Sequence, residues 1–145
     1  MTRYLSIDPG QSKCGLVVAD SKEKVILFAD VIKSSFLAEN VKELISGYQA
    51  YMVILGNGTT SKQFIKQLNF LGSKLIIVDE KNTTLRSKER YFDMFPLRGL
   101  KRFFPKELFL LNINLDAVAA LIILEDFCHY KFEFPESLGT KTWQK

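Results

Sequence analysis

The sequence contains few residues of the kinds that form disulfide frameworks or zinc sites. Its 145 residues include two cysteines, Cys14 and Cys128, and a single histidine, His129. These three residues do not have zinc-ligand spacing, and two cysteines are too few for a disulfide scaffold. We therefore expect both thiols to be structural, and we exclude disulfide-rich secreted domains and zinc-binding modules.

The apolar runs of the sequence are short. The longest, such as residues 51–55 and 75–78, are far shorter than the roughly 20 residues that cross a bilayer. The first residues do not form the basic and then apolar segment of a signal peptide. We expect a soluble, cytoplasmic protein that has no membrane partner. A hydrophobic content of 47% in 145 residues predicts one globular domain.

Five segments have the composition of β-strands. They are residues 3–8, 14–19, 25–32, 51–55 and 75–78. Polar turns separate the first three, which predicts an antiparallel meander. The last two are continuously apolar and flank a helical stripe. This pattern is typical of parallel strands covered on both faces.

Helical periodicity occupies most of the remaining chain. The stripes cover residues 36–47, 64–71, 83–95 and 115–130. Gly47 is expected to end the first helix, and Thr83 or Thr84 to cap the third. The prolines and glycine after residue 95 predict an irregular, exposed basic segment. We expect residues 1–131 to form one domain and residues 132–145 to be a loosely held tail.

Three acidic residues occupy positions where a carboxylate is costly unless it has a use. Asp8 follows the first strand, Glu80 follows the last strand, and Asp116 lies at the start of the last helix. Ligands of α/β sheets collect at the carboxyl ends of parallel strands, so Asp8 and Glu80 should meet there and Asp116 could join them. Three carboxylates suit Mg²⁺ or Mn²⁺. Two such ions can promote phosphodiester cleavage.

Each acid also has a purely structural explanation. Asp8 fits a turn with the proline and glycine that follow it, and Asp116 is favoured by the dipole of its helix. Asp79 and Glu80 fit a solvated loop pair, and either of them could be the metal ligand. The sequence Gly-Asn-Gly-Thr-Thr-Ser at residues 56–61 suits a phosphate, or simply a capped connection between a strand and a helix.

A basic stretch runs from Lys81 to Lys106. Eight basic residues face two acidic residues there, which leaves a surplus of six positive charges. Such a surplus is typical of a polyanion-binding surface. The aromatic residues interleaved with these bases suit stacking on nucleic acid, and they suit a hydrophobic core equally well.

Four segments carry a resemblance to a known family. They are Asp8-Pro-Gly10 with Gly15, Gly56-Asn-Gly-Thr59, Asp79-Glu-Lys-Asn-Thr-Thr84 and Leu115-Asp-Ala-Val-Ala-Ala120. In this order they resemble the motifs of the YqgF/RuvX family of Holliday-junction resolvase-like proteins, in the ribonuclease H-like superfamily. The resemblance implies an α/β, ribonuclease H-like fold with a five-stranded mixed sheet, three antiparallel strands and then two parallel, and helices on both faces. It implies that Asp8, Glu80 and Asp116 are catalytic residues that bind a divalent metal.

Two positions depart from the commonest family pattern. Many members have Gly-x-Pro where this chain has Gly-Asn-Gly at residues 56–58, and arginine where it has Lys81. The Gly-Asn-Gly form also resembles the YqgF-like domain of the transcription accessory protein Tex. Activity is therefore a separate hypothesis from fold.

The resemblance implies a metal-dependent nuclease with Mg²⁺ or Mn²⁺ as cofactor and structured nucleic acid as partner. The substrate would be branched DNA, as in DNA recombination, or precursor 16S ribosomal RNA, and the protein a monomer or a homodimer. The residues expected to contact nucleic acid are Gly10, Lys13, Thr59, Thr60, Thr84, Arg86, Lys101 and Arg102. One alternative is a catalytically inactive nucleic-acid-binding module of the same fold. Another is an ATP-phosphate site of the actin and sugar-kinase type, for which the chain is short.

Overall fold

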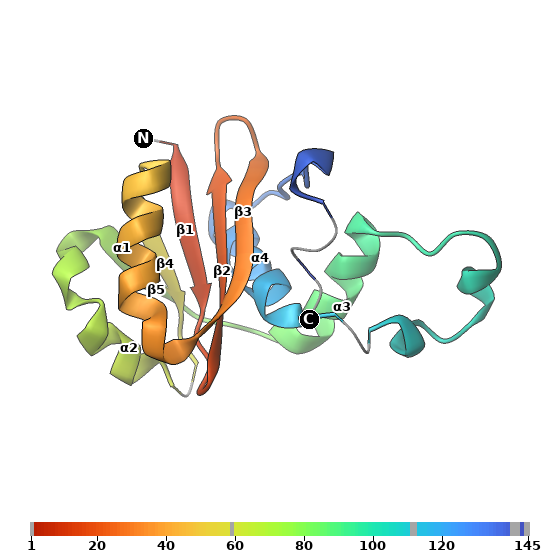
Figure 1. Cartoon of the computed structure of the whole chain (residues 1–145), viewed down its shortest axis with the longest axis horizontal. Helices are drawn as coiled ribbons and strands as arrows, with labels where there is room; N and C mark the ends of the chain where they lie inside the picture. The colour runs from red at the N-terminus through yellow and green to blue at the C-terminus, as the bar shows by residue number, and fades with distance from the viewer. Residues whose placement is uncertain (1, 59, 111–112, 140–142, 144–145) are drawn as a thin grey trace.

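The computed structural model describes residues 2–58, 60–110, 113–139 and 143 (Figure 1). Within these residues the strands are β1 (Arg3–Asp8), β2 (Lys13–Asp20), β3 (Val25–Lys33), β4 (Met52–Gly56) and β5 (Leu75–Val78). They form one sheet in the order β3-β2-β1-β4-β5. The pairs β1–β2 and β2–β3 are antiparallel, whereas β1–β4 and β4–β5 are parallel. The predicted meander followed by two parallel strands is confirmed.

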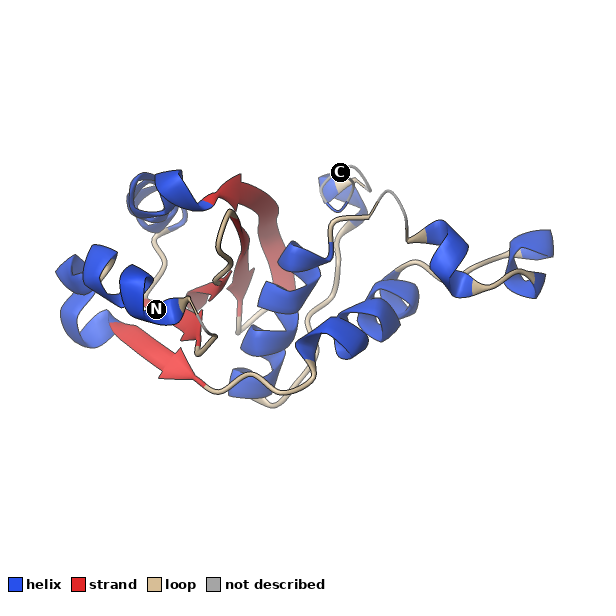
Figure 2. Ribbon diagram, turned by 90° about the horizontal axis from the view of Figure 1, so that it is seen from below, coloured by secondary structure: helices blue, strands red, loops and turns tan. Residues whose placement is uncertain are grey.

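Successive side chains of β1 point to opposite faces of the sheet, and the hydrophobic core accordingly has two layers, one on each face. Leu5 and Ile7 pack on the face covered by α1 (Leu37–Tyr48) and α2 (Ser61–Gln67). Ser6 faces the opposite way, toward α4 (Leu115–Cys128), where its hydroxyl donates to the carbonyl of Ala120 over 2.7 Å. Helices therefore cover both faces, as predicted (Figures 1 and 2).

The central part of the helix α4 (Leu115–Cys128) is buried on all sides. The sheet covers one side of it, and α3 (Thr83–Met94) lies alongside it on the other (Figure 2). Every residue from Ala117 to Glu125 is buried as a result. The helical stripe predicted over residues 115–130 therefore understates the burial of this helix, because α3 covers a second side of it. None of the described helices combines the length and apolar character needed to cross a bilayer.

Two predicted helix boundaries are wrong. The helix α1 continues past Gly47 and ends before Gln49, which takes the left-handed conformation with φ 55°. No threonine side chain caps α3. The chain reverses instead at Asn82, which has φ 52° and makes no side-chain capping hydrogen bond. Both left-handed positions are occupied by amide residues rather than glycine, and the propensities used for prediction favour glycine there.

The chain between α3 and α4 is irregular, as predicted. It consists of short 3₁₀ turns, η3 (Gly99–Phe103) and η4 (Lys106–Phe109), which project from the body of the molecule (Figure 1). Three further turns are η1 (Ser34–Phe36), η2 (Asn69–Lys74) and η5 (Glu136–Leu138). We call residues 96–109 the basic arm.

The expectation of a loosely held tail is wrong for the residues described there. Phe132 and Trp143 are only 2% and 0% exposed, and both belong to the α4-side core. Glu133 pairs with the edge of β3, since its carbonyl accepts from the amide of Ile26 over 2.9 Å. The amide of Asn114, just before α4, donates to the carbonyl of Trp143 over 2.8 Å. Large aromatic side chains fix this segment, because leaving them in water would be unfavourable.

Candidate active site

Asp8 ends the central strand β1 on the face that α4 covers. The β1–β2 register places it opposite Gly15. Its neighbour Ile7 is fully buried, whereas Asp8 itself is partly exposed. The strand therefore delivers a carboxyl group from the core to the edge of the sheet.

Asp116 reaches the same place from the first turn of α4. Asn114 caps this helix by accepting a hydrogen bond from the amide of Asp116 over 3.2 Å. The helix end is so close to β2 that a Cβ atom on Gly15 would lie 1.9 Å from the Asp116 carbonyl oxygen. Gly15 is therefore what allows Asp116 to approach the end of β1.

Glu80 follows β5 and turns back over the end of β4. A Cβ atom on Gly56 would lie 1.8 Å from its Oε1 atom, so a second glycine creates the space for this carboxylate. Oε1 is buried, and it has no hydrogen-bond partner among the described residues. A buried, unsatisfied carboxylate oxygen is costly, and a ligand is one explanation for its persistence.

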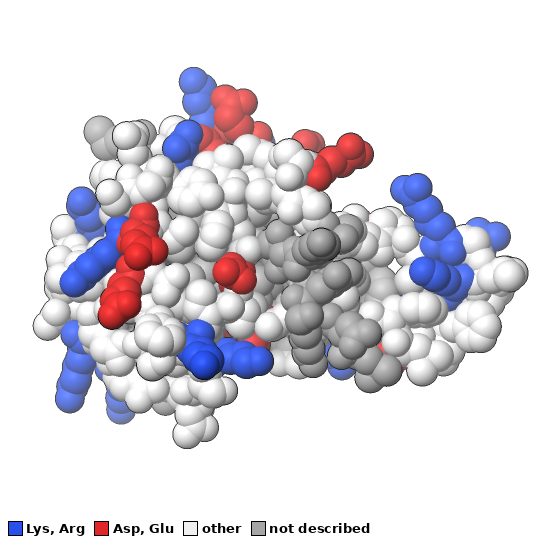
Figure 3. Space-filling model, in the orientation of Figure 1, with Lys and Arg blue, Asp and Glu red and all other residues white. Residues whose placement is uncertain are grey.

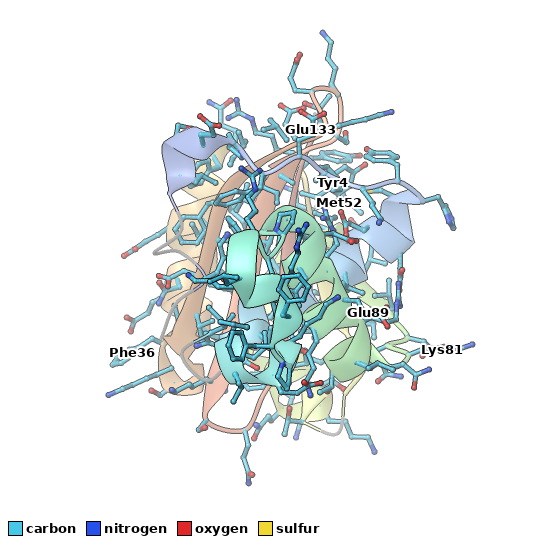
Figure 4. All side chains as sticks on the ribbon, turned by 90° about the vertical axis from the view of Figure 1, so that its right-hand side faces the viewer. Tyr4, Phe36, Met52, Lys81, Glu89 and Glu133 are labelled. Carbon is cyan, nitrogen blue, oxygen red and sulfur yellow. The ribbon has the colours of Figure 1, made fainter. Side chains whose placement is uncertain are left out.

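The residues on either side of Glu80 point elsewhere. Asp79 is exposed, and its Oδ1 atom accepts a hydrogen bond from the side chain of Asn57 over 3.2 Å. Lys81 is also exposed, and Figure 4 shows its side chain extending away from the body of the molecule. Of the acidic pair, Glu80 is the member directed toward the sheet edge.

The three acids interact electrostatically. Burial, followed by the charges of Glu80 and Asp116, raises the pKa of Asp8 to about 8. Burial also raises the pKa of Glu80. Asp8 is therefore the member of the set whose ionisation responds to the charges of both other acids.

The residues expected to contact nucleic acid have mixed positions. Gly10 lies in the turn after β1, where its carbonyl accepts from the Ser34 hydroxyl over 2.8 Å. Lys13 begins β2 and is exposed. Thr60 directly precedes α2, and Thr59 lies outside the described residues.

Thr84 and Lys88 lie one turn apart on α3 and line a cavity together with Glu80. Lys88 also lines a second cavity, with Asn114 and Asp116. Lys88 thus borders both the cavity that contains Glu80 and the cavity that contains Asp116. Sequence reasoning counted Lys88 among the bases but did not assign it to the site. The sequence feature that could have placed Lys88 at the site is its spacing of four residues from Thr84, which puts both residues on one face of a helix.

Arg86 faces the groove between α3 and α4. Its guanidinium donates two hydrogen bonds to Asp126, over 2.8 and 2.6 Å. It lines a different cavity from the one that contains Glu80. A contact between Arg86 and nucleic acid would therefore require this ion pair to open.

No protein-family model matches the sequence, and no curated protein matches it. Solved structures with a similar fold include two resolvases. RuvC of T. thermophilus, in complex with a Holliday junction substrate, matches with a TM-score of 0.53 and 14% identity, over 89% of this chain and 96% of that chain. The Fowlpox virus resolvase, in complex with substrate Holliday junction DNA, matches with a TM-score of 0.50 and 17% identity, over 88% and 97%. The fold is ribonuclease H-like.

In this ribonuclease H-like fold the acids lie at the carboxyl ends of β1 and β5 and at the start of α4. As placed, no group of three or more histidine, cysteine, aspartate or glutamate side chains within the described residues could ligate one ion. The donor chemistry nevertheless fits a hard divalent cation, because all three groups are carboxylates. A cation would also satisfy the buried Oε1 atom of Glu80 and relieve the repulsion that raises the pKa of Asp8.

Proposed function

We propose that this protein is a metal-dependent nuclease that cleaves phosphodiester bonds in structured nucleic acid. The proposal is carried by the electrostatic coupling of Asp8 to Glu80 and Asp116, which come from three separate elements of the fold. Such a cluster destabilises the protein unless a cation or a proton compensates it. The fold shared with two resolvases, both solved with Holliday junction DNA, supports nucleic acid as the substrate.

The three carboxylates would hold Mg²⁺ or Mn²⁺ through their oxygens. Such an ion, when bound, activates a water molecule and stabilises the leaving oxygen of the phosphodiester. Lys88 borders the cavities on both sides of the cluster, and its ammonium group would offset the charge of the phosphate. The Thr84 hydroxyl shares one of these cavities with Glu80 and would donate a hydrogen bond to a phosphate oxygen.

Other contacts would lie farther from the cluster. Gly10 lies in the turn after β1, Lys13 begins β2, and Thr60 directly precedes α2. Thr59 lies outside the described residues and stays a proposed contact. Lys101 and Arg102 belong to the basic arm and would contact the backbone at a distance from the cut. Arg86 would join them only if its ion pair with Asp126 opened.

We further propose that the protein is a nuclease of the YqgF/RuvX type. The supporting residues are the segments 79–84 and 115–120, which contain Glu80 and Asp116 and resemble that family's motifs. The substrate would be either branched DNA or the end of precursor 16S ribosomal RNA. Symmetrical cutting of a DNA junction would require a two-fold dimer, whereas trimming of RNA would not.

The proposal is tested by measuring cleavage of a four-way DNA junction and a pre-16S rRNA end side by side, with Mg²⁺, Mn²⁺ or EDTA. We expect cleavage only with a divalent ion. Asp8→Asn should abolish cleavage and leave nucleic-acid binding largely intact, because it removes one anionic ligand while the side chain keeps nearly the same size. Asp79→Asn is the matched control and should cut at the parent rate, since Asp79 is exposed and faces Asn57. An Asp8→Asn protein that cuts as fast as the parent would disprove the proposal.

A second candidate function is nucleic-acid binding without catalysis. It is favoured by the absence, within the described residues, of a group of side chains placed to ligate an ion. This candidate predicts binding that weakens steeply with salt, and no turnover of either substrate with either metal. Turnover by the parent protein that is lost in Asp8→Asn would exclude it.

A further inference from the structure

The basic arm exposes large apolar side chains to solvent. The exposed fractions are 78% for Leu100, 74% for Phe103, and 56% for both Phe104 and Leu108. Among the other large apolar residues described, only Leu85, which is 61% exposed, reaches a comparable value. Exposure of several large apolar groups on one short segment is unfavourable in an isolated protein, and it is a common mark of a binding surface.

The arm is held by its own local contacts. Within the described residues, its backbone amides donate to carbonyls three residues earlier, as from Phe104 to Lys101 and from Leu108 to Pro105. One contact to the body is the ammonium of Lys106, which lies 5.5 Å from the centre of the Phe92 ring. The arm therefore carries its exposed rings on a separate projection, away from the sheet (Figure 1).

The structure separates two groups of aromatic residues that the sequence could not distinguish. Tyr91, Phe92 and Phe95 lie on or just after α3, where Tyr91 contacts both other rings at centroid distances of 5.4 and 5.1 Å. Phe95 packs in turn on Phe134 over 5.1 Å. These rings belong to the body of the molecule. Phe103, the most exposed aromatic ring, belongs to the arm and is available to a ligand.

The charge of the arm identifies its ligand. Arg98, Lys101, Arg102 and Lys106 outnumber the single acid, Glu107. Figure 3 shows Lys and Arg side chains gathered on this projection. The guanidinium of Arg102 lies 5.3 Å from the centre of the Phe103 ring. An apolar protein partner would have to bury these charges, and a second copy of the arm would repel them. Phosphates between stacked bases complement both the charges and the rings.

We propose that the basic arm binds unpaired bases of a branched nucleic acid. Phe103 and Phe104 stack on the bases, while Lys101 and Arg102 neutralise the adjacent phosphates. The inference rests on the proposed function, because the same substrate would be cut at the acidic cluster. The inference goes beyond the proposed function because it assigns recognition of the unpaired bases to the basic arm, whereas the acidic cluster is assigned the cleavage.

The test is equilibrium binding of the full chain in EDTA, where no cutting occurs. The probes are a four-way DNA junction with 2-aminopurine at an unstacked position beside the branch, and a fully paired duplex of equal length. Phe103→Ala should weaken junction binding by roughly 5- to 100-fold and reduce the change in 2-aminopurine fluorescence. It should leave duplex binding and the salt dependence unchanged. Lys101→Ala should instead lower the slope of log affinity against log salt by about one.

Phe70→Ala provides a matched control. Phe70 is 46% exposed, and the Lys42 ammonium lies 4.9 Å from its ring centre, but it lies in η2 at the far side of the sheet. This variant should bind the junction as the parent does. Equal losses on junction and duplex for Phe103→Ala, or no loss on either, would overturn the inference. So would a parent dimer that becomes a monomer in Phe103→Ala by sedimentation, since the arm would then be an interface between copies of the chain.

The two proposals can fail separately. A protein that shows the Phe103 effect in EDTA but never cuts would refute the nuclease and leave the arm as a binding site. A protein that cuts with Mg²⁺ but shows no Phe103 effect would refute the role of the arm alone.

Discussion

The ionisation of Asp8 should make the stability of the metal-free protein depend on pH. The pKa of this carboxyl is about 8 in the folded protein, against an ordinary value of 3.8. Between these values the folded state binds the proton and the unfolded state does not, so stability falls as pH rises. The contribution is fully present below pH 4 and is lost by about pH 8. The burial of Glu80 acts in the same direction.

We therefore predict that Asp8→Asn is more stable than the parent at pH 8 in EDTA, by on the order of a few kcal/mol. At pH 4 the two proteins should unfold alike. Thermal unfolding followed by circular dichroism at pH 4, 6 and 8 measures the difference. Added Mg²⁺ should raise the melting temperature of the parent at pH 8 and have little effect on Asp8→Asn. Parallel curves for the two proteins would contradict this prediction.

The acids and their glycines differ in how far sequence could identify them. Asp8, Glu80 and Asp116 can be identified from sequence because strand ends and helix starts are visible in the hydrophobic pattern. Gly15 and Gly56 have steric roles that depend on how closely α4 and Glu80 approach the sheet. Such distances are set by packing between elements remote in sequence, and local patterns do not contain them.

At the scale of elements, two arginines of α3 form ion pairs with α4 in contrasting surroundings. Arg90 pairs with Glu125 over 2.9 Å, with side chains only 10% and 8% exposed. Arg86 pairs with Asp126 over 2.6 Å, with side chains 40% and 43% exposed. Arg90 also donates to the carbonyl of Phe132 over 2.7 Å, so it joins α3, α4 and the C-terminal segment.

We predict that Arg90→Ala lowers the free energy of unfolding by about 3–5 kcal/mol, because it leaves Glu125 charged and buried without a partner. Arg86→Ala is the matched control and should cost roughly 0–1 kcal/mol, since its pair is exposed to solvent. Urea unfolding followed by circular dichroism compares the two variants. Equal losses would show that burial does not distinguish these pairs.

The helices and strands were largely predictable, and their contacts were not. The spacing of the apolar residues predicted the bounds of β1 to β5 and of α1 to α4 to within a few residues. The same pattern did not show that α3 covers α4, because α3 carries charged residues on that side. Arg90 and Glu125 look like surface residues until their partners are known. The groove between these helices is therefore the least predictable part of the fold.

At the scale of the whole molecule, the C-terminal segment decides how much of the chain is needed for folding. Our sequence-based domain boundary at residue 131 remains a prediction. The burial of Phe132 and Trp143 argues that the body depends on residues beyond it. The aromatic residues in this otherwise polar segment are the sequence feature that indicates its burial.

We predict that Trp143→Ala lowers the free energy of unfolding by about 3–5 kcal/mol, as expected for a buried aromatic residue. Removal of residues 132–145 should lower it further, since Phe132 is lost as well. Urea unfolding of the parent, the point variant and the truncated chain provides the comparison. A truncated chain with an unchanged midpoint would establish residues 1–131 as a domain that folds without the segment.

The local construction of the basic arm has a consequence for how such proteins diversify. Its described backbone hydrogen bonds join residues three positions apart, and the helices on either side of it, α3 and α4, are joined to each other by the Arg90–Glu125 ion pair. Residues 96–109 could therefore be exchanged for a different projection without disturbing the sheet that presents the acids. Chains that share this sheet could in this way present different surfaces by replacing a single insert.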